Sequence, residues 1–68
     1  METVVIKVAG MSCQGCVKSV TGALTAVPGV AFAEVSLEQG EARVAFDPAT
    51  ASVAQLRQAV DDAGFDAD

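Results

Sequence analysis

The sequence predicts an α+β domain in which two helices cover one face of a four-stranded antiparallel sheet. Three observations lead to this fold class. Three segments are rich in β-branched or alternating apolar residues, and a short segment remains at the end of the chain. Two segments between them repeat apolar residues at spacings of three and four, and glycine or proline stands near most of the joins. The resulting order of strand, helix, strand, strand, helix and strand repeats one unit twice.

The first strand and the first helix have clear patterns. Residues 3–9, TVVIKVA, are rich in β-branched side chains, and their alternation places Ile6 on one face and Lys7 on the other. Further along, apolar residues share one helical stripe: Val17, Val20, Leu24 and Val27. We therefore expect a helix over residues 14–27 that ends before the Pro-Gly pair at 28–29.

A β-hairpin is predicted next. Residues 30–37 and 41–46 read as two strands around a turn at residues 39–40. The side chains expected to face inward are Ala33, Val35, Leu37, Ala42, Val44 and Phe46. Phe32 falls out of phase with this inward set, so we expect a β-bulge or a single exposed apolar residue at that point.

The second helix has a recognisable start and end. Ser52 is followed three residues later by Gln55, which is a capping-box pattern, and Gly64 marks the C-terminal end. The predicted buried stripe consists of Val53, Leu56, Val60 and Ala63. Residues 65–68, FDAD, leave room for only a very short last strand.

The order of these elements defines the topology. Right-handed crossovers place both helices on one face of the sheet, which makes a ferredoxin-like β-α-β-β-α-β open-faced sandwich. We expect residues 1–68 to form this single domain. The last strand then lies antiparallel beside the first. Phe65 is therefore expected close in space to Cys13 and Cys16.

Composition excludes several classes of function. The chain has 68 residues and a formal net charge of −5, and its basic residues are scattered: Lys7, Lys18, Arg43 and Arg57. This charge argues against nucleic acid or an anionic membrane as partner. No apolar run is long enough for membrane insertion and the N-terminus lacks the pattern of a signal peptide, so we expect a cytoplasmic protein.

Size and the lack of histidine argue against an enzyme. A chain this short leaves little room for a deep substrate cleft. Histidine, the commonest general base and zinc ligand, is absent. Two cysteines without histidine cannot complete a Cys₂His₂ or Cys₄ zinc site within one chain.

The cysteine pair carries the chemistry. Cys16 is expected in the first turn of the helix, where unpaired N–H groups and the helix dipole favour a thiolate. Gly10 and Gly15 are expected to let the backbone bend so that the sulfurs of Cys13 and Cys16 point to one ion. Two soft thiolates suit Cu(I) better than Zn(II), which prefers four ligands. By itself the C-x-x-C spacing leaves a redox pair and half of a zinc site as alternatives.

The segment GMSCQGC, residues 10–16, resembles the G-M-x-C-x-x-C signature of the heavy-metal-associated domain. This family includes small bacterial copper chaperones, the N-terminal modules of copper-transporting P-type ATPases and periplasmic mercury-binding proteins. The similarity extends over essentially the whole chain, through VPGV at 27–30, ARVAFDP at 42–48 and DDAGFDA at 61–67.

The resemblance implies a role for each residue of the motif. It implies that Cys13 and Cys16 bind the metal, whereas Met11 packs inward beneath the loop and is not a ligand. Phe65 stands where bacterial copper chaperones often carry a tyrosine, and it is interpreted either as an apolar lid near the metal or as a cap on the core. Ser12 and Gln14, the variable positions, are expected to face solvent or a partner.

The resemblance also implies a function. The implied protein is a copper(I) chaperone that binds one Cu(I) and transfers it by ligand exchange to the C-x-x-C domain of a metal-transporting P-type ATPase. Ag(I), Hg(II) and Zn(II) share the same ligands and remain alternative ions. The expected state is a monomer without metal, with a metal-bridged dimer as an alternative when loaded. Three other readings stay open: a module of a P-type ATPase, a mercury-binding protein, and a thiol-disulfide redox protein.

Overall fold

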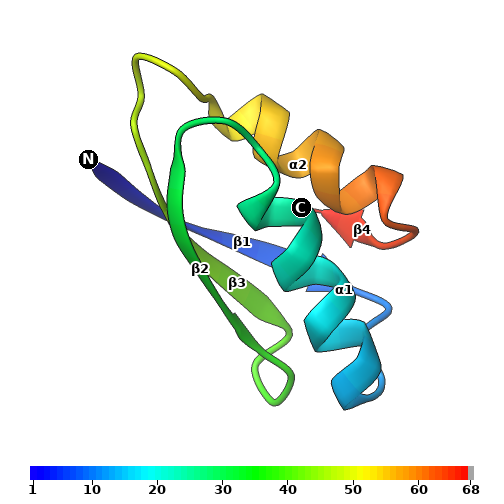
Figure 1. The fold of residues 1–68 in the computed structure, drawn as a ribbon. Coiled ribbons are helices and arrows are strands. Elements are labelled where there is room, and N and C mark those ends of the chain that lie inside the picture. The colour runs from blue at the N-terminus through cyan, green and yellow to red at the C-terminus, as the bar shows by residue number, and fades with distance from the viewer. Residues whose placement is uncertain (68) are drawn as a thin grey trace.

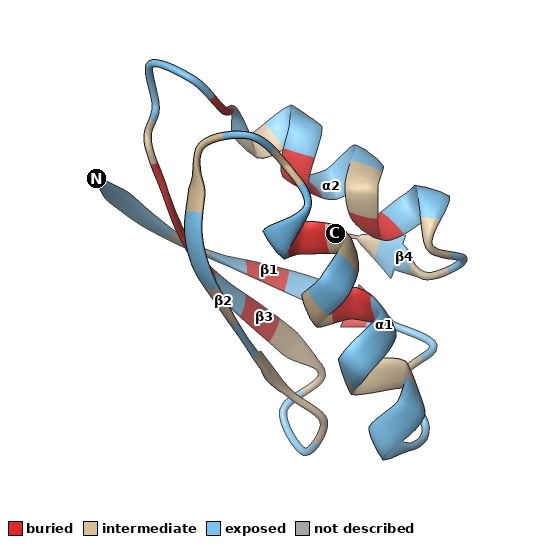
Figure 2. Ribbon diagram, in the orientation of Figure 1, coloured by how far each residue is buried: buried red, intermediate tan, exposed pale blue. Residues whose placement is uncertain are grey.

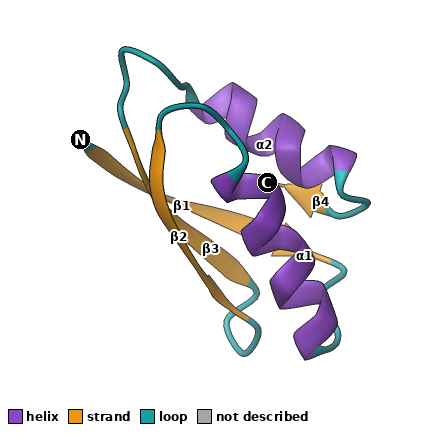
Figure 3. Cartoon of the chain, in the orientation of Figure 1, coloured by secondary structure: helices purple, strands orange, loops and turns teal. Residues whose placement is uncertain are grey.

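The computed structural model describes residues 1–67 (Figure 1). Its elements follow the predicted order: β1 (Glu2–Ala9), α1 (Gln14–Thr25), β2 (Val30–Ser36), β3 (Glu41–Phe46), α2 (Val53–Asp62) and β4 (Asp66–Ala67). Asp68, which ends the segment in which the last strand was predicted, lies outside the described residues. Both helices lie on the same side of the sheet (Figure 3). The ferredoxin-like fold predicted from the sequence is therefore confirmed.

All pairs in the sheet are antiparallel, and the strand order is β2-β3-β1-β4. In the register of β1 and β3, Ile6 lies opposite Ala42, and both residues are buried. The short strand β4 pairs with the end of β1, where Ala67 lies opposite Val8. The chain therefore returns to the sheet beside the point where β1 leads into the cysteine loop.

The core lies between the sheet and the two helices, as Figure 2 shows by burial. The largest fully buried side chains come from two strands, β1 and β3, and from both helices: Ile6, Leu24, Leu56, Val20, Val44 and Val60. Within residues 1–67 no polar or charged side chain is buried. The core is thus built from aliphatic side chains together with Phe46, and burial of their apolar surface is the main stabilising contribution to the fold.

Helix α1 ends earlier than its apolar stripe predicts. The stripe continues to Val27, but the helix ends at Thr25, and the amide of Val27 donates to the carbonyl of Leu24 at 3.1 Å in a tighter turn. Pro28 disfavours a helical conformation for Val27, and Gly29, with a φ of +95° and close to Thr50, turns the chain toward β2. Val27 still packs against the core from this turn, so burial alone did not reveal where the helix stops.

The predicted irregularity at Phe32 is a β-bulge. Val30 pairs with Phe46 and Phe32 pairs with Ala45, so Ala31 is an extra residue in β2. The bulge reverses the alternation at this point, and Phe32 is 50% exposed on the open face of the sheet.

The capping box of α2 is confirmed. The hydroxyl of Ser52 accepts from the amide of Gln55 at 3.3 Å, and the side-chain oxygen of Gln55 accepts from the amide of Ser52 at 2.8 Å. Two donors that the first turn would leave unpaired are thereby satisfied. Among the described residues neither helix has the length and apolar character needed to cross a bilayer.

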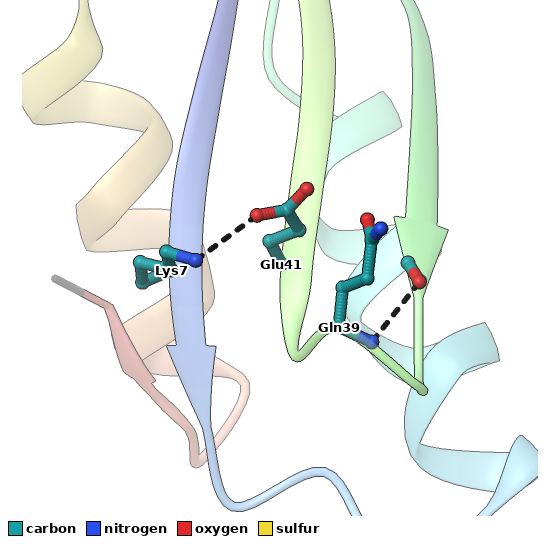
Figure 4. A network of polar contacts seen from close by, with 4 residues as sticks. Lys7, Gln39 and Glu41 are labelled. Atoms are coloured by element: carbon teal, nitrogen blue, oxygen red, sulfur yellow. Dashed lines mark hydrogen bonds and ion pairs between the residues drawn. The ribbon is translucent and has the colours of Figure 1, made fainter.

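The open face of the sheet carries two ion pairs beside the exposed apolar side chains of Val5 and Phe32. Lys7 on β1 and Glu41 on β3 form an ion pair with 3.1 Å between nitrogen and oxygen (Figure 4). On the other side of β3, Arg43 approaches Glu34 of β2 at 3.8 Å. Exposed ion pairs of this kind contribute about 0–1 kcal/mol each to the free energy of folding, so they add little to the stability of the domain.

Candidate metal centre

The backbone places the cysteine pair at the start of α1. Gly10, with a φ of +96°, follows the end of β1 and turns the chain into the loop. Cys13 is the N-cap residue of α1 and is extended, with φ −157° and ψ 169°. Its carbonyl accepts from the amide of Cys16 at 3.0 Å and from that of Val17 at 3.3 Å. The first helical turn thus brings Cys16 back over Cys13.

The two sulfurs lie together. The Sγ atoms of Cys13 and Cys16 are 3.3 Å apart, and one thiol donates a hydrogen bond to the other. Both cysteines are free; Cys13 is exposed and Cys16 is half-buried. The arrangement is a dithiol at the junction of the loop and α1, with both sulfur atoms available to a single soft ion.

Hydrogen bonds favour the thiolate form of Cys16. The backbone amide of Ser12 lowers the pKa of Cys16 most, the thiol of Cys13 lowers it further, and partial desolvation opposes both. The position in the first turn of a helix acts in the same direction, because unpaired N–H groups there stabilise a negative charge. A thiolate is the form that binds metal, so these contacts prepare the sulfur for a cation.

The lowered pKa predicts a pH profile. In Cys13→Ser the only thiol is Cys16, and the Ser12 amide still stabilises its thiolate. We expect the rate of alkylation by iodoacetamide to rise with pH at a lower midpoint in the folded variant than in the same variant in concentrated urea. The midpoint is lower because the folded state binds the Cys16 proton less tightly than the unfolded state does. By linkage, the same difference in pKa stabilises the folded state as the pH rises through the folded pKa. Equal midpoints in the two states would contradict the assignment.

Ser12 and Gly15 were interpreted incompletely from the sequence. Ser12 is exposed, as expected, but its backbone amide and its hydroxyl also contribute to lowering the pKa of Cys16. Gly15 was expected to bend the backbone together with Gly10. That is wrong for Gly15, which lies inside α1 and has no positive φ. Its position between the two cysteines was the only feature of the sequence that pointed to a role for Gly15 at the site.

Phe65 and Met11 flank the loop. A Cβ on Gly10 would lie 3.6 Å from Cδ1 of Phe65, so the phenyl ring packs against the backbone at the start of the loop. Phe65 is half-buried and also packs against the core. Met11 is half-buried and packs against the core as well. The structure therefore places both side chains under or beside the loop that carries the sulfurs.

The site offers few protein ligands. Within residues 1–67 no group of three or more cysteine, histidine, aspartate or glutamate side chains lies close enough to hold a metal ion. A hollow on the open face of the sheet, between β2 and β3, is lined instead by polar and charged side chains: Glu34, Ser36, Gln39, Glu41 and Arg43. The described chain thus offers two cysteine sulfurs with no third cysteine or carboxylate clustered beside them, which suits a soft ion that accepts low coordination.

Comparison with known proteins decides the family. A model of the heavy-metal-associated domain matches residues 5–66. The chain belongs to the heavy-metal-associated domain family. This confirms the resemblance seen in residues 10–16 and agrees with the ferredoxin-like topology.

Relatives of this heavy-metal-associated domain include free-standing proteins and parts of long transporters. The copper chaperone CopZ of Staphylococcus saprophyticus is 44% identical over 66 residues, which cover 97% of each chain. Copper-transporting ATPase 1 of Rattus norvegicus is 41% identical over 66 residues, which make up 97% of this chain and 4% of the ATPase. The crystal structure of a copper-binding domain from a P-type ATPase has a TM-score of 0.99 at 40% identity, covering 100% of this chain and 92% of that one.

Proposed function

We propose that this heavy-metal-associated domain is a copper(I) chaperone that holds one Cu(I) between Cys13 and Cys16. The observation that carries the proposal is the pair of sulfurs 3.3 Å apart where the loop enters α1, with no third cysteine or carboxylate clustered beside them in the described chain. Soft thiolates and low coordination number both favour Cu(I) over Zn(II). A relative of nearly the same length, named a copper chaperone, supports the same conclusion.

Transfer follows from the low coordination number. A thiolate of an acceptor adds to the bound Cu(I) and forms a third sulfur–copper bond. One of the two original bonds then breaks, and the released thiolate takes a proton from water when the pH is below its pKa. Copper remains in the +1 state throughout, and no electron is exchanged. Because Cys13 is the more exposed of the two residues, an incoming ligand approaches the copper from the side of Cys13.

The partner we propose is the C-x-x-C domain of a metal-transporting P-type ATPase in the cytoplasm. Domains of this family that are about 40% identical to this chain occur within such ATPases, so donor and acceptor would present similar thiol pairs. Exchange between similar sites has a small equilibrium free energy, which allows metal to move in either direction according to its supply. In this proposal residues 1–68 act as a single domain, monomeric without metal, and catalyse no reaction.

An anaerobic titration tests the proposal. The reduced protein is titrated with Cu(I) in the presence of the chromogenic chelator bicinchoninate, with Cys13→Ser/Cys16→Ser as the control. We expect one equivalent to be withheld from the chelator by the wild type and none by the double variant. Loaded protein mixed with a C-x-x-C acceptor should then pass on its copper, as measured after separating the two by ion exchange.

The outcome that would overturn the proposal is complete removal of copper by the chelator from the wild-type protein. Parallel titrations with Ag(I), Hg(II) and Zn(II) identify the preferred ion. Tighter retention of Hg(II) or Zn(II) than of Cu(I), each measured against a chelator of known affinity, would assign the thiol pair to that ion.

A further inference from the structure

Gly15 lies at a position where the backbone conformation does not require glycine. It is the second residue of α1 and is exposed, in the first turn that Figure 2 shows at the surface. Its φ is not positive, unlike that of the glycines in the turns and loops. Inside a helix, glycine is less favourable than alanine because it loses more conformational freedom on folding. The local fold would therefore accept a larger residue here.

The space beside Gly15 is taken up by the sulfur of Cys13. A Cβ built on Gly15 would lie 3.6 Å from this Sγ, which is an ordinary van der Waals distance, so alanine fits without strain. Helical side chains tilt toward the N-terminus and cover the surface of the preceding turn. In α1 that surface holds Cys13, the N-cap residue. A side chain at position 15 would therefore lie against the more exposed of the two sulfurs.

We propose that Gly15 keeps the approach past the Cys13 sulfur open for a thiolate that attacks the bound Cu(I), and that its missing side chain sets the rate of metal exchange. This inference rests on the proposed function and specifies which residue controls the rate of exchange at that site. In the exchange step the acceptor's sulfur–copper bond forms before the bond to Cys13 breaks, so the acceptor must approach while Cys13 is still bound. Atoms beside Cys13 Sγ obstruct this three-coordinate state. They leave the two-coordinate complex with its ligands unchanged.

The same helix supplies a matched control. Gly22 also lies in α1, is exposed and has no positive φ, but a Cβ built on it meets no heavy atom within 4 Å. Substitution of Gly22 changes helix propensity in the same direction as substitution of Gly15, without covering a sulfur. Comparing Gly15→Ala and Gly15→Leu with Gly22→Ala and Gly22→Leu therefore separates obstruction of Cys13 from stabilisation of the helix.

The first experiment needs no metal. In a Cys16→Ser background, the rate at which N-ethylmaleimide modifies Cys13 is measured for all four variants at one pH. We expect Gly15→Ala to slow modification slightly and Gly15→Leu to slow it about tenfold, equivalent to about 1.4 kcal/mol of activation free energy. The Gly22 variants should react like their parent. Equal rates for Gly15→Leu and the parent, or equal slowing by Gly22→Leu, would overturn the inference.

The second experiment measures exchange in the protein with both cysteines. Copper passes from each loaded variant to an excess of a reduced C-x-x-C acceptor under rapid mixing, and affinity is measured separately with bicinchoninate. We expect Gly15→Ala to transfer copper more slowly than the wild type, and Gly15→Leu to transfer it more slowly still. The affinity should change much less, because a covering side chain slows loading and release alike. A loss of affinity as large as the loss of rate would show that Gly15 shapes the bound state instead, and would overturn the inference.

The two experiments distinguish the inference from the proposed function. If the wild-type protein retains no copper against the chelator, the proposed function fails, and the modification rates of Cys13 still decide whether Gly15 governs access to its sulfur. If copper is retained and the modification rates do not follow the size of residue 15, the inference fails and the proposed function stands.

Discussion

Replacing either cysteine by serine is expected to lower the affinity for Cu(I) by more than about 100-fold, the upper range for loss of a residue that only supports a metal ligand. Cys13→Ser and Cys16→Ser each remove one of two sulfurs that lie 3.3 Å apart, and no third cysteine or carboxylate clusters with them in residues 1–67. A serine hydroxyl is a hard donor that stays protonated near neutral pH, so it does not replace a soft thiolate. Competition with bicinchoninate at fixed pH measures the loss.

Stability without metal serves as the control for these variants. Cys13 is the N-cap of α1 and its side chain makes no capping hydrogen bond, whereas serine is among the preferred residues at that position. Cys13→Ser should therefore unfold at the same temperature as the wild type or a higher one, and its loss of copper is then not a loss of fold. Retention of one tight equivalent by either single variant would show that the pair is not the metal site.

The second large effect is expected from Gly29→Ala, which should destabilise the fold by several kcal/mol. Gly29 has a φ of +95°, a conformation that costs other residues about 1–2 kcal/mol. In addition, a Cβ at this position would lie 2.8 Å from Cβ of Thr50 and 3.2 Å from Cβ of Ala51. Relieving this overlap requires the start of β2 to separate from the segment before α2, and overpacking of this kind typically costs about 1–3 kcal/mol more.

Gly64→Ala isolates the steric part of this effect. Gly64 has the same φ of +95°, but a Cβ there meets no atom within 4 Å. Urea unfolding should therefore place Gly64→Ala between the wild type and Gly29→Ala. Identical free energies of unfolding for the two alanine variants would mean that the contact with Thr50 relaxes without cost, and that backbone conformation alone requires glycine at position 29.

Much of the fold could be predicted because its signals are local. The alternation in β1 and β3 identified their inward side chains, and the spacing of Ser52 and Gln55 identified the start of α2 together with its reciprocal hydrogen bonds. These patterns depend on residues two to four positions apart, within one strand or one helical turn. Three elements of the chain were therefore located nearly to the residue before any tertiary contact was considered.

The boundaries that were missed depend on contacts between distant segments. The apolar stripe of α1 runs on to Val27, but the helix ends at Thr25, and the chain then turns at Gly29, which lies against Thr50. The bulge at Ala31 was expected only as one of two explanations for Phe32, because its position is set by pairing with β3. Neither segment carries a local pattern that specifies its partner.

The features of the candidate site also fall into those that local sequence determines and those that tertiary contacts determine. The sequence by itself determined which two residues carry the sulfurs, since the C-x-x-C spacing at the start of a helix brings side chains three positions apart onto one turn. Only the tertiary structure decided that Phe65 packs on Gly10, that the amide of Ser12 lowers the pKa of Cys16, and that Gly15 leaves space beside Cys13. Residue type and spacing determine which atoms are near in the chain. The direction of a backbone N–H group, and the atoms that border an absent side chain, become definite only when the loop closes against β1, α1 and β4.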